Sequence, residues 1–183
     1  MQYPALGDPD LAARPEIACT CAGASRRPLG SRPRYLVGSA PVYPQADIPV
    51  VQLSIDETQP PSFHSEVGKR LAVLREEGIL ILGSGNVVHN LHAYAWGRHA
   101  PEPYDWAISF ENRIRELLFA EDHTPLINYE NQLGTEADLA VPTPDHYLPL
   151  LYVIGTRTPS EPVAFPVEGV DGGSVSMLAL QVG

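Results

Sequence analysis

The feature that most constrains the fold is a short apolar run, residues 79–82, that directly follows an amphipathic stretch, residues 61–77. The amphipathic stretch carries its apolar residues at helical spacing: Phe63, Val67, Leu71 and Leu74. This spacing predicts a helix, which Gly78 is well suited to end. A run that is apolar at every position is typical of a strand buried on both faces of a parallel sheet. A helix followed by such a strand is the pattern of an α/β protein.

Residues 43–183 continue to alternate apolar runs with amphipathic stretches. The further elements predicted are a strand over residues 47–55, an amphipathic helix over residues 104–120, a third helix over residues 143–155, and a β-hairpin with strands at residues 162–168 and 174–182. The third helix is expected to begin with the Thr143 hydroxyl as its cap and Pro144 in its first turn. Pro149 is expected to kink it.

The composition excludes several classes of protein. The chain has 183 residues, of which 44% are hydrophobic and 19% charged, which is ordinary for one globular domain with a packed core. A formal net charge of −10 disfavours nucleic acid or an anionic membrane as partner, because both are negatively charged themselves. No apolar run is long enough to cross a bilayer, and the first residues lack the basic and apolar segments of a leader. We therefore expect a cytoplasmic protein.

Residues 14–42 differ in character from the rest of the chain. They hold the two cysteines, Cys19 and Cys21, whose spacing is wrong for a zinc knuckle. They also hold four of the arginines: Arg26, Arg27, Arg32 and Arg34. Because no periodic apolar pattern is present, one interpretation is a disordered or variable loop. The chain is accordingly divided into an atypical segment, residues 1–42, and a main part, residues 43–183.

The main part contains motifs of a known family. Residues 43–55, 83–91 and 142–153, with the ending at residues 166–178, resemble the 4,5-DOPA dioxygenase branch of the class III (LigB-type) extradiol dioxygenases. The resemblance implies a single α/β domain with a central mixed sheet flanked by helices, incomplete at its N-terminus. It also implies an oxidoreductase that opens the ring of a catechol, such as DOPA, with O2 at a non-haem Fe(II) or Zn(II) centre. A small catechol and O2 are then the partners, and the oligomeric state is left open.

Two features of that family are not found here. Members begin with a longer N-terminal part that carries a His-Gly-Ser-Pro loop and a second histidine, both metal ligands. They also carry a Gly-Leu-Asp-His-Gly-Thr-Trp motif where this chain has residues 29–39. Read one base later, permitted codons for residues 29–39 can spell that motif, so we hypothesise that residues 15–42 are translated out of frame. Strands next to the missing part are expected to present unpaired edges and exposed apolar surface.

His89 is the first candidate for catalysis and for metal binding. It follows the predicted strand at residues 79–82 and a glycine-containing turn, residues 83–86. That order places it beyond the carboxyl end of a sheet strand, where open α/β sheets bind ligands. The alternative from the residues alone is a histidine that caps a helix over residues 87–91. The resemblance favours the site.

His146 is the second candidate, in the first turn of the helix predicted from Thr143. The positive end of a helix disfavours imidazolium, so the ring would stay neutral and able to bind a metal or accept a proton. The alternative is a half-buried histidine packed beside Tyr147. The resemblance implies an active-site role, but it leaves open which of His89 and His146 is a ligand and which the acid or base.

The remaining candidates are weaker. His64 is expected at the boundary of the first helix, and His92, His99 and His123 at the surface. Tyr94 and Trp96 are expected either in a core or beside an aromatic substrate. The alternative to an active dioxygenase is an inactive remnant, because two histidines without partners hold a metal only weakly. A metal-dependent hydrolase is disfavoured, because the sequence has no further carboxylate cluster.

Overall fold

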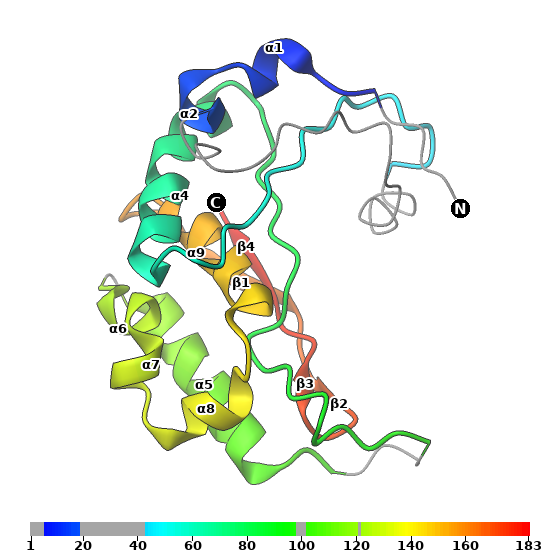
Figure 1. The fold of residues 1–183 in the computed structure, drawn as a ribbon, viewed down its shortest axis with the longest axis vertical. Helices are drawn as coiled ribbons and strands as arrows, with labels where there is room; N and C mark the ends of the chain where they lie inside the picture. Colours follow the sequence, from blue (N-terminus) through cyan, green and yellow to red (C-terminus); the bar gives the residue numbers. More distant parts are fainter. Residues whose placement is uncertain (1–5, 19–42, 98–101, 121) are drawn as a thin grey trace. The chain divides into compact units, whose positions relative to one another are not determined.

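The structure is a computed structural model that describes residues 6–18, 43–97, 102–120 and 122–183 (Figure 1). Its contacts divide the chain into two compact units, Met1–Asp56 and Glu57–Gly183, where the length predicted a single domain. Within the described residues, no strand precedes Val163. The described residues of the first unit are therefore not part of any sheet. Most of the atypical segment, residues 19–42 with both cysteines, lies outside the described residues.

The first unit contains two short helices, α1 (Pro9–Ala12) and α2 (Pro15–Ala18). The Asp8 carboxylate caps α1 by accepting a hydrogen bond from the Leu11 amide at 2.8 Å. The strand predicted over residues 47–55 is wrong, because this segment is not assigned to a strand. Residues 51–55 keep the alternation of half-buried and exposed side chains that suggested a strand, but they lack a hydrogen-bonded neighbour strand.

The second unit is built around two helices in close contact, α4 (Pro61–Glu76) and α9 (Leu148–Gly155), shown side by side in Figure 1. Glycines let the two backbones approach. A Cβ added at Gly155 would lie 2.6 Å from the Ser65 carbonyl oxygen, and one added at Gly68 would collide with the Tyr152 carbonyl oxygen. This crossing holds the helix predicted over residues 61–77 in place, and that prediction is confirmed.

A third long helix, α5 (Asp105–Phe119), confirms the prediction for residues 104–120. It packs with two short helices, α6 (Thr124–Ile127) and α8 (Thr135–Ala140), and both of these contact a third, α7 (Tyr129–Gln132). The most deeply buried side chains of this unit include Phe110, Ile114, Leu118, Leu126, Tyr147 and Leu151. The Tyr147 hydroxyl donates to the Leu126 carbonyl at 3.0 Å, which satisfies the one polar atom this large side chain brings into the core.

The helix predicted over residues 143–155 forms in two pieces. A 3-10 turn, η3 (Pro144–His146), comes first and α9 follows from Leu148. Thr143 makes no side-chain capping bond, so the predicted cap is wrong. Pro149 does not kink α9, because it lies in the first turn, where its missing N–H has no intrahelical acceptor to lose.

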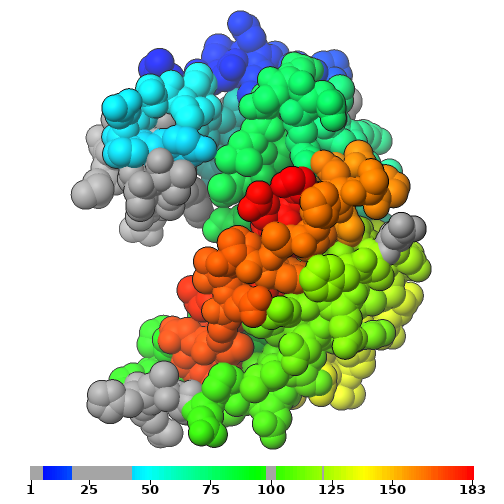
Figure 2. Space-filling model, turned by 180° about the vertical axis from the view of Figure 1, so that it is seen from behind, coloured from blue at the N-terminus to red at the C-terminus, as the bar shows by residue number. Residues whose placement is uncertain are grey.

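The strands form two small antiparallel sheets. β1 (Val163–Val167) pairs with β4 (Ala179–Val182), and β2 (Val170–Asp171) pairs with β3 (Val175–Ser176). On the face in Figure 2, the C-terminal residues (red) lie beside residues of the preceding part of the chain (orange), as the β1–β4 pairing requires. Gly172 and Gly173 have φ values of 54° and 83°, which glycine adopts without strain at this turn. The predicted C-terminal hairpin is thereby confirmed.

The central mixed sheet expected from the resemblance is not found among the described residues, which contain only the two-stranded sheets. Residues 79–82, expected as a buried parallel strand, run as an extended segment without strand assignment. Leu80 and Leu82 are 68% and 76% exposed. The physical reason is the lack of a neighbouring strand, since an isolated extended chain cannot form a ladder. The mixed α/β character itself is confirmed, and no helix of the described ranges is long and apolar enough to cross a membrane.

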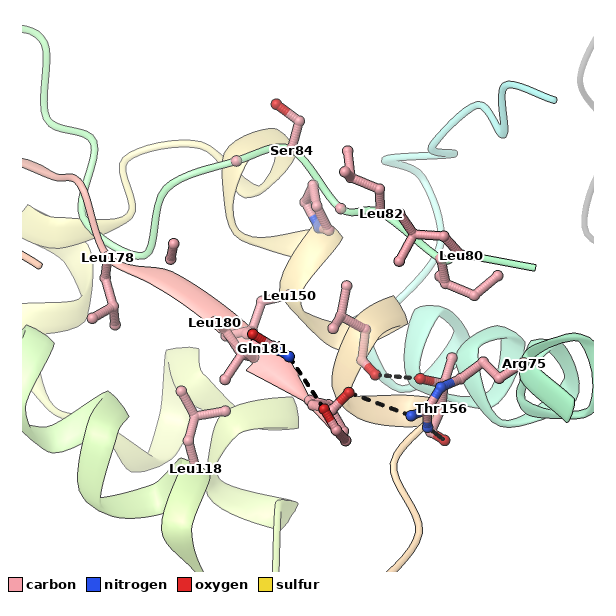
Figure 3. Close-up of a pocket in the computed structure, with 18 of the residues that line it drawn as sticks. Arg75, Leu80, Leu82, Ser84, Leu118, Leu150, Thr156, Leu178, Leu180 and Gln181 are labelled. Carbon is pink, nitrogen blue, oxygen red and sulfur yellow. Dashed lines mark hydrogen bonds between the residues drawn. The ribbon is translucent and has the colours of Figure 1, made fainter. Parts of the chain in front are cut away.

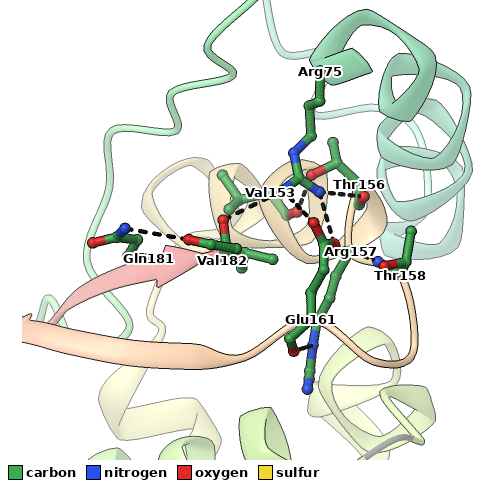
Figure 4. A network of polar contacts seen from close by, with 9 residues as sticks. Arg75, Val153, Thr156, Arg157, Thr158, Glu161, Gln181 and Val182 are labelled. Carbon is green, nitrogen blue, oxygen red and sulfur yellow. Dashed lines mark hydrogen bonds and ion pairs between the residues drawn. The ribbon is translucent and has the colours of Figure 1, made fainter. Parts of the chain in front are cut away.

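Four polar groups link the end of α4 to the loop between α9 and β1 (Figure 4). The Arg75 guanidinium at the end of α4 donates to both carboxylate oxygens of Glu161 at 2.9 and 2.6 Å. It also donates to the Thr156 carbonyl at 2.9 Å. The Thr158 amide donates to the same Glu161 carboxylate at 2.7 Å. The bonds fix the loop between α9 and β1 against α4.

Candidate functional site

His89 and His146 lie together although they come from distant parts of the sequence. Their ring centroids are 5.0 Å apart and the ring planes meet at 35°. Backbone hydrogen bonds join the two segments: the Asn86 amide donates to the His146 carbonyl at 2.9 Å, and the His89 amide donates to the Ala140 carbonyl at 2.9 Å. A Cβ at Gly85 would collide with the His146 carbonyl oxygen, so this close approach needs glycine.

The His89 ring is buried and both of its nitrogens face backbone carbonyl oxygens. Nδ1 lies 3.1 Å from the Asn86 oxygen and Nε2 lies 2.9 Å from the Thr143 oxygen. A neutral imidazole has one N–H and satisfies only one of these acceptors. Burial nevertheless lowers the pKa of His89, against the opposing effect of the Thr143 carbonyl. In the neutral form that burial favours, one nitrogen faces an acceptor to which it cannot donate.

The His146 side chain is 49% exposed, and its Nε2 lies 3.5 Å from a carboxylate oxygen of Asp145. The expected position in the first turn of a helix is wrong, because His146 ends a three-residue 3-10 turn. The Thr143 hydroxyl, and then the nearby His146 ring, lower the pKa of Asp145. Asp145 is thus an anion beside an accessible imidazole. Its position next to His146 in the sequence was the available signal for this contact.

A polar framework behind His89 holds the segment that carries it. The side-chain amide nitrogen of Asn86 donates to the Ser176 carbonyl at 2.6 Å. The Ser176 hydroxyl in turn donates to the buried Glu111 carboxylate at 2.6 Å. His89 itself forms an isolated antiparallel bridge with Val175. These contacts link the site to α5 and β3. Sequence reasoning missed Asn86, Ser176 and Glu111, because nothing in their local sequence signals a partner so far along the chain.

The described residues do not make a complete metal site. Among them, no three or more His, Cys, Asp or Glu side chains are grouped so that they could hold a metal ion. Both ring nitrogens of His89 face carbonyl oxygens, so this ring would have to turn before it could act as a ligand. His146 and Asp145 offer accessible donors, but two such groups leave the geometry of a metal undefined. A metal ion held here would need further donors from outside the described residues.

The other predicted positions lie elsewhere. His64, expected at a helix boundary, is fully buried in α4 with Nδ1 2.9 Å from the Tyr152 hydroxyl. His92 is exposed as expected, His123 is half-buried beside Arg157, and His99 lies outside the described residues. The Tyr94 and Trp96 rings are 4.5 Å apart and line a separate hollow of about 330 Å³. Trp96 is 69% exposed, so it is not a core residue.

Three curated proteins that match this chain carry the same name. No family model matches the chain. The chain is 49% identical over 146 residues to the 4,5-DOPA dioxygenase extradiol of Escherichia coli (strain K12), covering 78% of this chain and 52% of that protein. It is 32% identical over 163 residues to the 4,5-DOPA dioxygenase extradiol of Portulaca grandiflora, and this match covers 85% of this chain and 58% of that protein. It is 31% identical over 181 residues to the 4,5-DOPA dioxygenase extradiol of Beta vulgaris, and this match covers 96% of this chain and 66% of that protein.

A solved structure is also similar. The crystal structure of an uncharacterized protein from Escherichia coli K12 matches with a TM-score of 0.85 and 41% identity, covering 100% of this chain and 76% of that one. The chain spans about half to two thirds of the length of the curated relatives that it matches.

Proposed function

The chain belongs to the family of the 4,5-DOPA extradiol dioxygenases, and from this premise we propose that its His89–His146 pair is one part of an aromatic-ring-opening site. The substrate is a catechol such as DOPA, and both atoms of O2 enter the ring-opened product, so no outside reductant is needed. The observation that carries the proposal is the 5.0 Å approach of the two rings in a chain 49% identical to a dioxygenase.

His146 is the better proton carrier of the pair. Its ring is half exposed, so a catechol hydroxyl can reach it, and its Nε2 lies 3.5 Å from the Asp145 carboxylate. His89 is buried, and both of its ring nitrogens face backbone carbonyl oxygens. Its contribution is to fix the segment opposite His146 and to present an uncharged wall.

The proposed cofactor of the whole enzyme is non-haem Fe(II) or Zn(II). Such an ion would bind the catecholate oxygens and bring O2 beside them. The described residues do not provide the donors that a defined site requires, so the reaction needs protein groups beyond them. A second candidate function follows from the same observation: the chain alone is a catalytically inactive member of the family.

One experiment separates the two. The purified chain is given Fe(II) and L-DOPA under air, beside the Escherichia coli relative as a positive control, and the yellow ring-opened product is followed by absorbance. We expect product from the relative and little or none from the chain. Turnover by the chain at a rate comparable with that of the relative would contradict the hypothesis that the chain is catalytically inactive. Absence of product from a chimera, in which the part of the Escherichia coli relative outside the match is joined to this chain, would contradict the dioxygenase proposal.

A further inference from the structure

Two hollows of the second unit differ in chemical character. The larger, of about 1050 Å³, is lined by many aliphatic side chains, among them Leu80 and Leu180 (Figure 3). The smaller, of about 330 Å³, is lined by two alanines and by three aromatic residues, Tyr94, Trp96 and Tyr104. Its volume is at the small end of the range of ligand pockets, which is about 300 to 1,000 Å³. We call this smaller one the aromatic hollow.

The aromatic hollow forms against the turn between β2 and β3. The Ala95 amide donates to the Gly172 carbonyl at 3.0 Å, and the Tyr104 amide donates to the Gly173 carbonyl at 3.0 Å. A Cβ added at Gly172 would collide with the Tyr94 ring, so this ring can lie on the turn only because glycine is present. Backbone hydrogen bonds and close packing therefore fix the segments that carry the rings.

Each of the three rings has its polar group bound within the chain. The acceptors are the Asp171 carboxylate for Tyr94 at 2.7 Å, the Leu91 carbonyl for Trp96 at 3.3 Å and the Ala93 carbonyl for Tyr104 at 3.1 Å. These bonds use the hydroxyl and indole donors, so the lining offers a ligand mainly aromatic surface. Trp96 is 69% exposed although it is held in place, which is typical of aromatic residues at binding surfaces.

The geometry of the rings favours a compact ligand over a flat one. The Tyr94 and Trp96 ring centroids are 4.5 Å apart and their planes meet at 53°. A flat aromatic ligand can stack on one of these rings but not on both, whereas a nearly spherical group can contact both. A sugar could lie on Trp96, but its hydroxyls would find the donors of all three rings already used.

Charge selects a cation among compact ligands. Aromatic faces carry partial negative charge and attract cations, quaternary ammonium groups above all, which have no N–H that needs an acceptor. The five residues that line the hollow are uncharged, and the exposed Asp171 carboxylate adds a negative charge in contact with one of them, Tyr94. The net charge of −10 attracts cations to the chain as a whole. We propose that the aromatic hollow binds the trimethylammonium group of a small organic cation.

Choline is the probe for this site. Its matched control is the neutral alcohol in which a tert-butyl group replaces trimethylammonium, because the two molecules have the same shape. Each is titrated into the isotope-labelled chain, and NMR follows the indole N–H signals of Trp96 and Trp106, which a Trp106→Phe variant assigns. We expect a saturable shift of the Trp96 signal with choline, with a dissociation constant on the order of 1 to 10 mM. The neutral alcohol should bind about fivefold more weakly or less.

Two substitutions at one position separate the aromatic ring from apolar bulk. Trp96→Leu keeps an apolar side chain without a ring and should weaken choline binding about fivefold, the effect expected from one cation–π contact. Trp96→Phe keeps a ring and should retain most of the affinity. Phe119→Leu removes a ring at a 60% exposed position on α5, outside the lining, and should leave the affinity unchanged. The Ala95 amide signal reports binding in every variant, and circular dichroism checks that all of them fold.

Several results would overturn the proposal. The first is a choline titration without a saturable shift, or with the same shift that an equal concentration of NaCl produces. Equal affinity for choline and the neutral alcohol would show that the hollow does not select a cation. Equal affinities of Trp96→Leu and Trp96→Phe, or an equal loss in Phe119→Leu, would place the binding elsewhere. None of these results bears on the proposed dioxygenase activity, because neither His89 nor His146 lines the hollow.

Discussion

Arg75 and Glu161 form a bidentate ion pair across the second unit, with N–O distances of 2.9 and 2.6 Å (Figure 4). The arginine ends α4 and the glutamate precedes β1, so the pair joins a helix to the C-terminal sheet. Fork-to-fork geometry of this kind is the strong form of a surface ion pair. The side chains are 23% and 24% exposed, which limits solvent screening without removing it.

Replacing Glu161 by glutamine should destabilise the chain. Glutamine keeps one acceptor but loses the charge that Arg75 faces, so we expect the free energy of unfolding to fall by about 1 kcal/mol. The matched control is Glu116→Gln, which removes an exposed i,i+3 partner of Arg113 and should be nearly neutral. Urea unfolding followed by circular dichroism measures both, and equal effects of the two changes would contradict the assignment.

The same carboxylate predicts a pH dependence. The Arg75 side chain, and then the Thr158 amide, lower the pKa of Glu161 from 4.5 to about 2. A carboxyl whose folded pKa is lowered adds stability above its unfolded pKa, and this contribution is lost as the pH falls towards the folded value. The stability difference between the natural chain and Glu161→Gln should therefore shrink between about pH 4.5 and pH 2. A stability difference between the two proteins that stays constant over this pH range would contradict the lowered pKa of Glu161.

Gly68 and Gly155 should not tolerate a side chain. Gly155→Ala places a methyl group 2.6 Å from the Ser65 carbonyl oxygen and 2.9 Å from the Gly68 Cα, both of which are backbone atoms that cannot rotate away. We expect a loss of about 2 to 3 kcal/mol, in spite of the better helix propensity of alanine. Val73→Ala, on the exposed face of α4, serves as control and should change stability little. Thermal melting checks the pair.

The sequence predicted the elements whose stability comes from local pattern. The helices at Pro61–Glu76 and Asp105–Phe119 and the hairpin around Gly172 were predictable, because helical spacing and turn residues are local signals. The strands predicted at residues 47–55 and 79–82 did not form, although their patterns are right for strands. A strand requires a neighbour, and no local pattern reports whether that neighbour is present.

The resemblance implied active-site roles for both His89 and His146, and the structure brings their rings to within 5.0 Å of each other. The detailed surroundings were not predictable. Both nitrogens of His89 face backbone oxygens of Asn86 and Thr143, and backbone groups carry no sequence signature.

The nucleotide sequence tests the origin of residues 15–42. If these residues are translated out of frame, the codons for residues 29–39 must spell the Gly-Leu-Asp-His-Gly-Thr-Trp motif when read one base later. Restoring the frame should then raise the identity to the relatives over this segment alone, with residues 43–183 unchanged. Codons that cannot yield the motif would end the hypothesis.

The last prediction concerns metal binding, whose affinity depends on how many donor side chains the chain can bring together. No three candidate side chains group among the described residues, and both His89 ring nitrogens face backbone carbonyl oxygens. Two donors from His146 and Asp145 give an affinity far below that of a structural zinc site, so we expect a dissociation constant weaker than about 1 μM for Zn(II). Calorimetry on the chain and on His146→Ala measures it, with His92→Ala as a control at an exposed histidine. Stoichiometric binding at sub-micromolar concentration, unaffected by His146→Ala, would show that a different set of residues holds the ion.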